Sequence, residues 1–151
     1  GAMMDMGCYP LQAARYVTGE EPVSVSAQGF TFREEYKEIE EAVSFELEFP
    51  GGAIAICTSG FHARYDYLDV SAKRGSIDLR PYSGYSGIKG GTNKERFIYP
   101  KMNQQATQMD DMAECILEGK PMRVPGEEGL KDMVVVDAIY KAMENNCKVI
   151  I

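Results

Sequence analysis

The sequence has 151 residues, of which 44% are hydrophobic, so the chain is long enough to bury the core of one domain. Its 16 Lys and Arg residues against 23 Asp and Glu residues give a formal net charge of -7. Because binding to a phosphate backbone depends on clustered cations, we expect no nucleic-acid partner.

The four cysteines, Cys8, Cys57, Cys115 and Cys147, lie far apart and form no CxxC pair, and His62 is the only histidine. We therefore expect reduced thiols, no metal site and a cytoplasmic location. No apolar run approaches the ~20 residues that span a bilayer, and the N-terminus lacks a signal-peptide pattern, so no membrane partner is expected. An export signal upstream of residue 1 would not show in this sequence.

The first predicted element is a helix over residues 7–18, where apolar residues recur at helical spacing before Gly19. Pro10 fits this helix in its first turn, where a missing N–H needs no partner. Asp5 and Tyr9 are then expected at the entrance of the helix.

Three segments with a period of two follow, and each predicts a strand. They cover residues 23–27, 43–49 and 53–57, and the turn at 50–52 predicts an antiparallel hairpin between the last two. The charged stretch 33–41 is interpreted as a solvated strand end or loop.

A second set of strands is predicted over residues 65–72, 76–80 and 96–99. The stretch 82–93 between them carries four glycines and is predicted to be an irregular loop. Loops of this length are often functional or mobile.

Two helices and a short strand complete the chain. The helices are predicted over residues 103–117 and from about 127 to 146, and the strand over 148–151. The apolar stripes of the two helices are expected in the core: Met109, Met112, Met133, Val136, Ile139, Tyr140 and Met143.

This order of elements indicates an α+β, two-layer domain with a mainly antiparallel, open-faced sheet and helices on one face. We expect residues 1–151 to form a single domain. The uncovered face of the sheet would need a partner, which predicts a homo-oligomer through that face.

The sequence contains no cofactor-binding fingerprint, because the glycines of 82–93 do not follow the GxGxxG pattern and open no helix. A surface loop is the more ordinary interpretation of that stretch. His62 is predicted at a hairpin tip, where an exposed non-catalytic histidine is common, and we keep it as a minor candidate for substrate contact.

Four segments carry a resemblance to a known family. They are residues 4–16 (MDMGCYPLQAARY), 59–89 with YSGIK at 85–89, 103–111 (NQQATQMDD) and 124–130 (VPGEEGL). Over nearly its whole length the chain resembles the C-terminal domain of the glucose-fructose oxidoreductase, inositol dehydrogenase and rhizopine catabolism (Gfo/Idh/MocA) family.

The resemblance implies the glyceraldehyde-3-phosphate dehydrogenase-like C-terminal fold and a missing N-terminal Rossmann domain that binds NAD or NADP. It implies hydride transfer between that cofactor and a sugar, sugar derivative or polyol. A lysine of the Rossmann domain would meet an Asp-x-x-x-Tyr pair, which Asp5 and Tyr9 match. The chain alone is then expected to bind no cofactor and to be inactive.

The chemistry explains such a pairing. Oxidising a carbinol requires removal of the hydroxyl proton, and a tyrosine with its reference pKa of ~10 is a poor base at neutral pH. A neighbouring lysine would favour the phenolate of Tyr9, and Asp5 could orient the reacting groups. By residue type alone, packing is the more ordinary role for Tyr9 and helix capping for Asp5.

The remaining substrate-binding candidates are His62, Tyr85, Asn103, Gln104 and Gln108. For the last three, capping and a solvated helix face compete with contact to the missing domain or the substrate. The alternative function for the whole chain is a stand-alone, non-catalytic α+β module that binds a ligand or dimerises.

Overall fold

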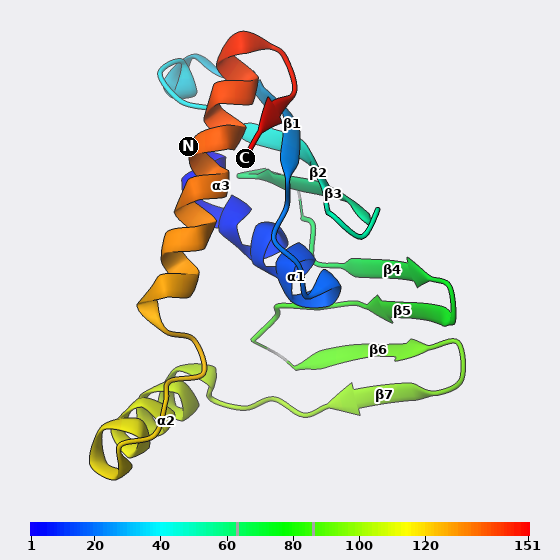
Figure 1. The fold of residues 1–151 in the computed structure, drawn as a ribbon, viewed down its shortest axis with the longest axis vertical. Coiled ribbons are helices and arrows are strands. Elements are labelled where there is room, and N and C mark those ends of the chain that lie inside the picture. Colours follow the sequence, from blue (N-terminus) through cyan, green and yellow to red (C-terminus); the bar gives the residue numbers. More distant parts are fainter. Residues whose placement is uncertain (63, 86) are drawn as a thin grey trace. The chain divides into compact units, whose positions relative to one another are not determined.

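The structure, a computed structural model, describes residues 1–62, 64–85 and 87–151. Ala63 and Ser86, which belong to the segment 59–89 considered above, lie outside the described residues. The chain forms two compact units: unit 1 comprises residues 1–65 and 126–151, and unit 2 comprises residues 66–125. Unit 1 is therefore built from both ends of the chain (Figure 1).

The sheet of unit 1 has four antiparallel strands in the order β3-β2-β1-β8. The strands are β1 Ser24–Phe30, β2 Ala42–Glu48, β3 Ile54–Gly60 and β8 Val149–Ile150. Gly52, with φ +85°, turns the hairpin between β2 and β3 as predicted. Alternate residues of β2 are buried, so one face of this sheet belongs to the core.

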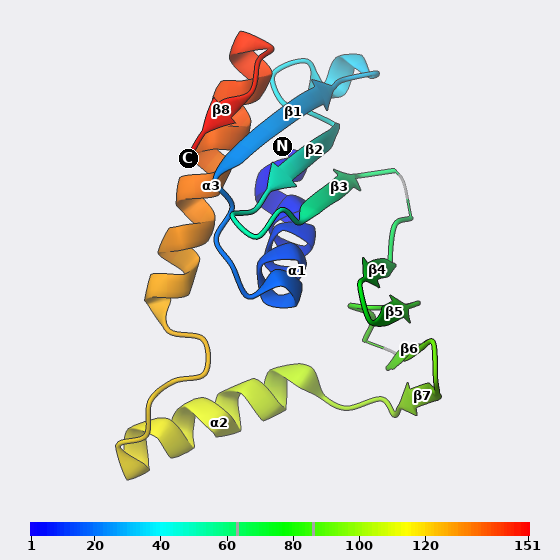
Figure 2. The same cartoon turned by 45° about the vertical axis from the view of Figure 1, so that its right-hand side comes forward.

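Two helices cover that face, as Figure 2 shows: α1 (Cys8–Thr18) and α3 (Gly126–Asn145). Pro10 lies in the first turn of α1, and Gly19 ends the helix with φ 68°, so the predicted helix is confirmed. A short π-helical turn, η1 (Met3–Gly7), precedes α1, and a 3₁₀ turn, η2 (Glu34–Tyr36), lies in the charged loop between β1 and β2.

The core of unit 1 joins this sheet face to the helices. Its fully buried side chains contribute roughly 1.5–3 kcal/mol each, and they include Met3, Leu11, Val25, Val43, Phe45, Leu47 and Ile139. The opposite face of the sheet is partly exposed and carries Ile54 and Ile56, which are both exposed.

Unit 2 consists of a four-stranded antiparallel meander and one helix. The elements are β4 Leu68–Ala72, β5 Gly75–Leu79, β6 Ile88–Thr92, β7 Arg96–Tyr99 and α2 Gln104–Glu118, with strand order β4-β5-β6-β7. Cross-strand ion pairs join Arg80 to Asp69 and, at 2.6 Å, Arg96 Nη1 to Asp78 Oδ1.

One predicted loop is wrong in part, because residues 88–92 of the stretch 82–93 form strand β6. A Cβ atom on Gly90 would lie 2.0 Å from the carbonyl oxygen of Asp78 on the neighbouring strand. Glycine permits this close approach, and the same glycines remove the alternation of side chains that identifies a strand.

The predicted burial of the helical stripes is correct for part of α3 and wrong for α2. Val136 and Ile139 are buried there, whereas Met133 is exposed. On α2, Met109 and Met112 are exposed, which contradicts their assignment to the core. Helical periodicity identifies an apolar face, but it does not reveal whether another element covers that face.

The α+β fold with antiparallel strands and helices on one face of the sheet in unit 1 is confirmed. None of the helices within the described ranges is long and apolar enough to cross a membrane.

Candidate active site

The candidate catalytic pair lies on one continuous helical run, which begins at Ala2, passes through η1 and ends at Thr18. Met3 and Leu11 on this run are fully buried, whereas Asp5 is exposed and Tyr9 is 49% exposed. Residues four apart on a helix are neighbours, so Asp5 and Tyr9 lie on the same side of the run. Single π-helical turns within α-helices often occur at functional sites.

The π-helical turn packs tightly on its buried side. A Cβ atom on Gly7 would lie 2.6 Å from Met3 Sδ, and both Gly7 and Met3 are buried. The absence of a side chain at Gly7 therefore leaves room for Met3 to enter the core. This packing turns the opposite side of η1, with Asp5, towards solvent.

The helical run that carries Asp5 and Tyr9 also exposes large apolar side chains. Met4 and Met6 flank Asp5, Tyr16 follows on α1, and all three are exposed. Exposed large apolar side chains along one element are typical of a surface that another part of a protein covers.

Glu40 binds the start of the helical run. Its Oε1 accepts a hydrogen bond from the backbone N–H of Met3 at 2.9 Å and another from Tyr140 Oη at 3.0 Å. Its carbonyl oxygen accepts the N–H of Ala2 at 2.9 Å. Burial, and then the hydrogen bond to Glu40, raise the pKa of Tyr140 to about 12, so this tyrosine remains a protonated donor at neutral pH.

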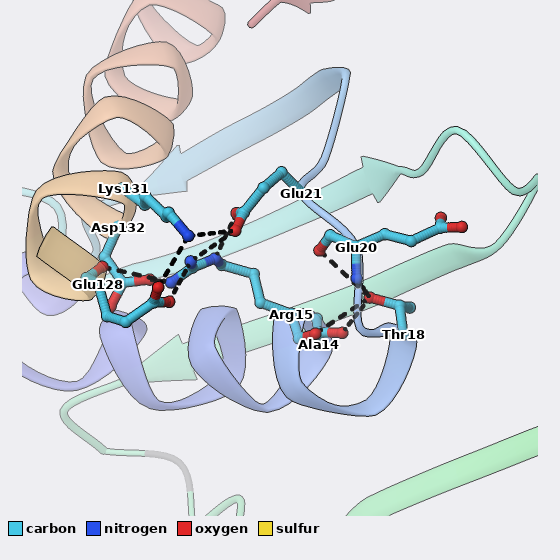
Figure 3. Close-up of polar contacts among 8 residues, drawn as sticks. All are labelled: Ala14, Arg15, Thr18, Glu20, Glu21, Glu128, Lys131 and Asp132. Atoms are coloured by element: carbon cyan, nitrogen blue, oxygen red, sulfur yellow. Dashed lines mark hydrogen bonds and ion pairs between the residues drawn. The ribbon is translucent and has the colours of Figure 1, made fainter. Parts of the chain in front are cut away.

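Arg15 binds the other end of the run to α3, as Figure 3 shows. Its Nε and Nη2 donate to the two carboxylate oxygens of Glu21 at 2.7 and 2.9 Å. Nη1 donates to Asp132 Oδ1 at 2.5 Å, and Nη2 donates to Glu128 Oε2 at 2.8 Å. Lys131 adds a second cation, 2.7 Å from Glu128 and 3.3 Å from Glu21.

The charges in this cluster stabilise one another. The hydrogen bonds to Glu21 raise the pKa of Arg15 above its ordinary range, and Arg15 in turn lowers the pKa of Glu21. Lys131, and then Arg15, lower the pKa of Glu128. Sequence reasoning missed this cluster, although one signal was present: Arg15 follows Leu11 by four residues and so lies on the buried stripe of α1.

His62 belongs to a different cluster of unit 1. Its Nε2 lies 3.5 Å from Glu41 Oε1, and its ring centre lies 5.9 Å from that of Tyr36. Glu41 is buried and also accepts the backbone N–H groups of Phe32 and Arg33. These contacts give His62 a structural partner, and its contact with substrate stays a prediction.

The other predicted site residues lie in unit 2. Asn103 caps α2, since its Oδ1 accepts the N–H of Ala106 at 3.1 Å. Gln104 Nε2 lies 3.5 Å from the carbonyl oxygen of Gly84, which brings the start of α2 next to the turn that holds the exposed Tyr85. Gln108 is exposed on α2.

In the described part of the glycine-rich stretch, Gly90 and Gly91 belong to a strand rather than to a phosphate-binding loop. Gly90 and Gly91 lie within β6, where Cβ atoms would overlap neighbouring backbone atoms, and no helix begins after them. These glycines therefore serve strand packing. Within the described residues, no group of three or more His, Cys, Asp or Glu side chains is placed to hold a metal ion.

Comparison with known proteins identifies the class to which the chain belongs. Residues 1–78, about half of the chain, match the family described as the GFO/IDH/MocA C-terminal domain. The chain belongs to this family.

Individual relatives extend the match beyond residue 78. The chain is 28% identical to the NADP⁺-dependent D-xylose 1-dehydrogenase of Haloarcula marismortui, over 98% of this chain and 43% of that protein. It is 25% identical to inositol 2-dehydrogenase of Rhizobium meliloti, over 95% of this chain and 47% of that protein. The chain thus spans about half the length of the curated relatives it matches.

A solved structure shows the same relationship. The aldose-aldose oxidoreductase from Caulobacter crescentus, complexed with glycerol, superposes with a TM-score of 0.89 at 36% sequence identity. The superposition covers 100% of this chain and 48% of that one.

Proposed function

We propose that this chain is the substrate-side half of an NAD(P)-dependent oxidoreductase that acts on a CH–OH group of a sugar, sugar derivative or polyol. The observation that carries the proposal is the placement of Asp5 and Tyr9 together on the exposed side of one helical run. The names of the relatives, a xylose dehydrogenase, an inositol dehydrogenase and an aldose-aldose oxidoreductase, support the substrate class.

In this proposal Tyr9 removes the proton of the substrate hydroxyl, and Asp5 orients the reacting hydroxyl groups. A lysine from the N-terminal Rossmann domain lies beside Tyr9 and favours its phenolate form. The dinucleotide supplies the redox chemistry, and the residues that bind it belong to the Rossmann domain. His62, Tyr85, Asn103, Gln104 and Gln108 are retained as candidate substrate contacts.

The test uses an enzyme that contains both halves, assayed with D-xylose and with myo-inositol by the absorbance of NAD(P)H. Tyr9→Phe is expected to lower kcat by roughly 100-fold or more with little change in KM, because the proton acceptor is lost. Tyr16→Phe is the matched control, since Tyr16 is also exposed on α1. Turnover that survives in Tyr9→Phe would contradict the proposal.

Residues 1–151 alone are expected to bind neither NAD nor NADP and to show no turnover. Isothermal titration calorimetry of the chain with NADH and with NADPH measures the binding directly. Micromolar binding by the chain would show that the division between the two halves is wrong and would favour a self-contained module.

We also propose that residues 1–151 act as one substrate-binding and oligomerisation domain, in which the uncovered face of the unit 1 sheet binds a second copy. The exposed Ile54 and Ile56 support this choice. Ile56→Lys is expected to reduce the mass measured by light scattering, whereas Met109→Lys on α2 leaves it unchanged. An unchanged mass in Ile56→Lys would exclude this face.

A further inference from the structure

We propose that Glu40 and Arg15 are positioning residues for the candidate active site. Glu40 binds the first turn of the helical run that carries Asp5 and Tyr9, and Arg15, near the end of the same run, joins it to α3. This inference rests on the function proposed for Asp5 and Tyr9. It extends the site to two side chains that need not touch the substrate.

Glu40 sets the position of the first turn. The first N–H groups of a helix have no acceptor within the helix, and Glu40 accepts two of them, from Ala2 through its carbonyl oxygen and from Met3 through Oε1. Met3 precedes Asp5 by two residues, so the contact lies within the turn that carries Asp5. A carboxylate at this end also stabilises the helix dipole.

Arg15 sets the position of the last turns. It lies six residues after Tyr9, which is about 9 Å along the helix axis. Its five hydrogen bonds, to Glu21, Glu128 and Asp132, match the five donors of a guanidinium, and its side chain is 5% exposed. Because the donors lie in one rigid plane, this contact restricts rotation of α1 as well as its translation.

Helix α3 supplies a partner at both ends. Tyr140 hydrogen-bonds Glu40, and Asp132 hydrogen-bonds Arg15, and these two residues of α3 are separated by about 12 Å along its axis. Helix α3 itself packs on the sheet of unit 1. Two separated polar contacts, together with the burial of Met3 and Leu11, fix the direction of the helical run more closely than either polar contact alone.

The geometry has a chemical consequence, because a displacement of about 1 Å at a reacting group can reduce catalysis by about 100-fold. Neither Asp5 nor Tyr9 is held by burial of its own side chain, since both are exposed. Their positions therefore depend on the backbone of the run. Glu40 binds that backbone, and Arg15, which belongs to the run, joins it to α3.

The test compares Glu40→Leu with Glu40→Gln in the enzyme that contains both halves, with D-xylose or myo-inositol as substrate. Glu40→Leu is expected to lower kcat at least tenfold, with KM within about threefold and an unchanged Kd for the dinucleotide. Glu40→Gln keeps an oxygen that can accept from Met3 and Tyr140, so it is expected to retain kcat within about threefold. Arg15→Gln is expected to lower kcat in the same way as Glu40→Leu.

Glu48→Leu is the matched control for a general loss of stability. Glu48 accepts from Ser24 Oγ at 2.5 Å and from Lys148 Nζ at 2.6 Å in the same unit, but it lies on β2 rather than against the run. Its loss is expected to lower Tm without lowering kcat. Amide hydrogen exchange in peptides from residues 2–9 should accelerate in Glu40→Leu and not in Glu48→Leu.

The outcomes separate the two proposals. If Tyr9→Phe abolishes turnover while the folded Glu40→Leu enzyme keeps its kcat, the positioning role is overturned and the proposed function stands. An equal loss of kcat in Glu48→Leu also overturns the positioning role. If Tyr9→Phe keeps turnover, the proposed function itself fails.

Discussion

Arg15 Nη1 lies 2.5 Å from Asp132 Oδ1, and both side chains are more than nine-tenths buried. Removing two charges from water is costly, and only close contact with further hydrogen bonds compensates for it. Glu21 and Glu128 supply these bonds to Arg15. Removal of one partner alone is therefore expected to lower the stability of the fold strongly, because the other partner then remains buried without its counter-charge.

Arg15→Met is expected to lower the free energy of unfolding by about 3–5 kcal/mol, since Asp132 loses its cation. Urea unfolding of the chain measures the change. The double variant Arg15→Met with Asp132→Leu should recover part of the loss. Arg33→Met is the control, because Arg33 is 48% exposed and its ion pairs are expected to contribute about 1 kcal/mol or less. Equal losses in the two single variants would contradict the assigned role of Arg15.

Acid should weaken the ion pairs between Arg15 and its carboxylate partners. Arg15 lowers the pKa of Glu21 below its ordinary value of 4.5, so Glu21 binds protons more weakly in the folded chain than in the unfolded chain. Its contribution to stability is complete above pH 4.5 and is lost as the pH falls through the lowered pKa. The difference in unfolding free energy between the native chain and Arg15→Met should shrink between pH 6 and pH 3. A difference that stays constant over this range would refute the explanation.

Replacement of two glycines by alanine should change the stability of the chain in opposite directions. Gly90→Ala is expected to destabilise unit 2 by about 1–3 kcal/mol, because the added Cβ would lie 2.0 Å from the carbonyl oxygen of Asp78. Gly129→Ala in α3 meets no atom within 4 Å and should stabilise by about 0.5–1 kcal/mol through helix propensity. Thermal unfolding of both variants measures the two shifts, and a stabilising Gly90→Ala would contradict the close approach of β5 and β6.

The cysteines should differ in reactivity. Burial raises the pKa of Cys57 to about 12, which keeps its thiol protonated, whereas Cys147 is exposed. Iodoacetamide at pH 8 should therefore modify Cys147 in the native chain and Cys57 only after unfolding, as mass spectrometry can follow. Equal rates at both positions in the native chain would show that Cys57 is accessible.

Local patterns in the sequence predicted most of the elements. The alternation in residues 43–49 reports a strand with one buried face, and this is how β2 packs. Gly19 and Gly119 end α1 and α2 with φ values of 68° and 66°, as expected for glycines that follow helices. These signals are readable because each depends on residues that are close together in the chain.

Contacts between distant residues were not predictable in this way. Arg15 meets Asp132 across 117 positions, and Glu40 meets Tyr140 across 100. Strand β6 was missed because its glycines carry no side-chain alternation. Asp5 and Tyr9 were identified from the family resemblance, and the structure adds that both lie on the exposed side of the same run.

The construction of unit 1 from both ends of the chain has a consequence for synthesis on the ribosome. The helical run with Asp5 and Tyr9 is translated before residues 66–125, whereas Glu128, Asp132 and Tyr140 are translated after them. Until then the run lacks its contacts with α3, and premature termination leaves them unmade. The helical run that carries Asp5 and Tyr9 therefore gains its contacts with α3 only after residues 126–140 have been translated.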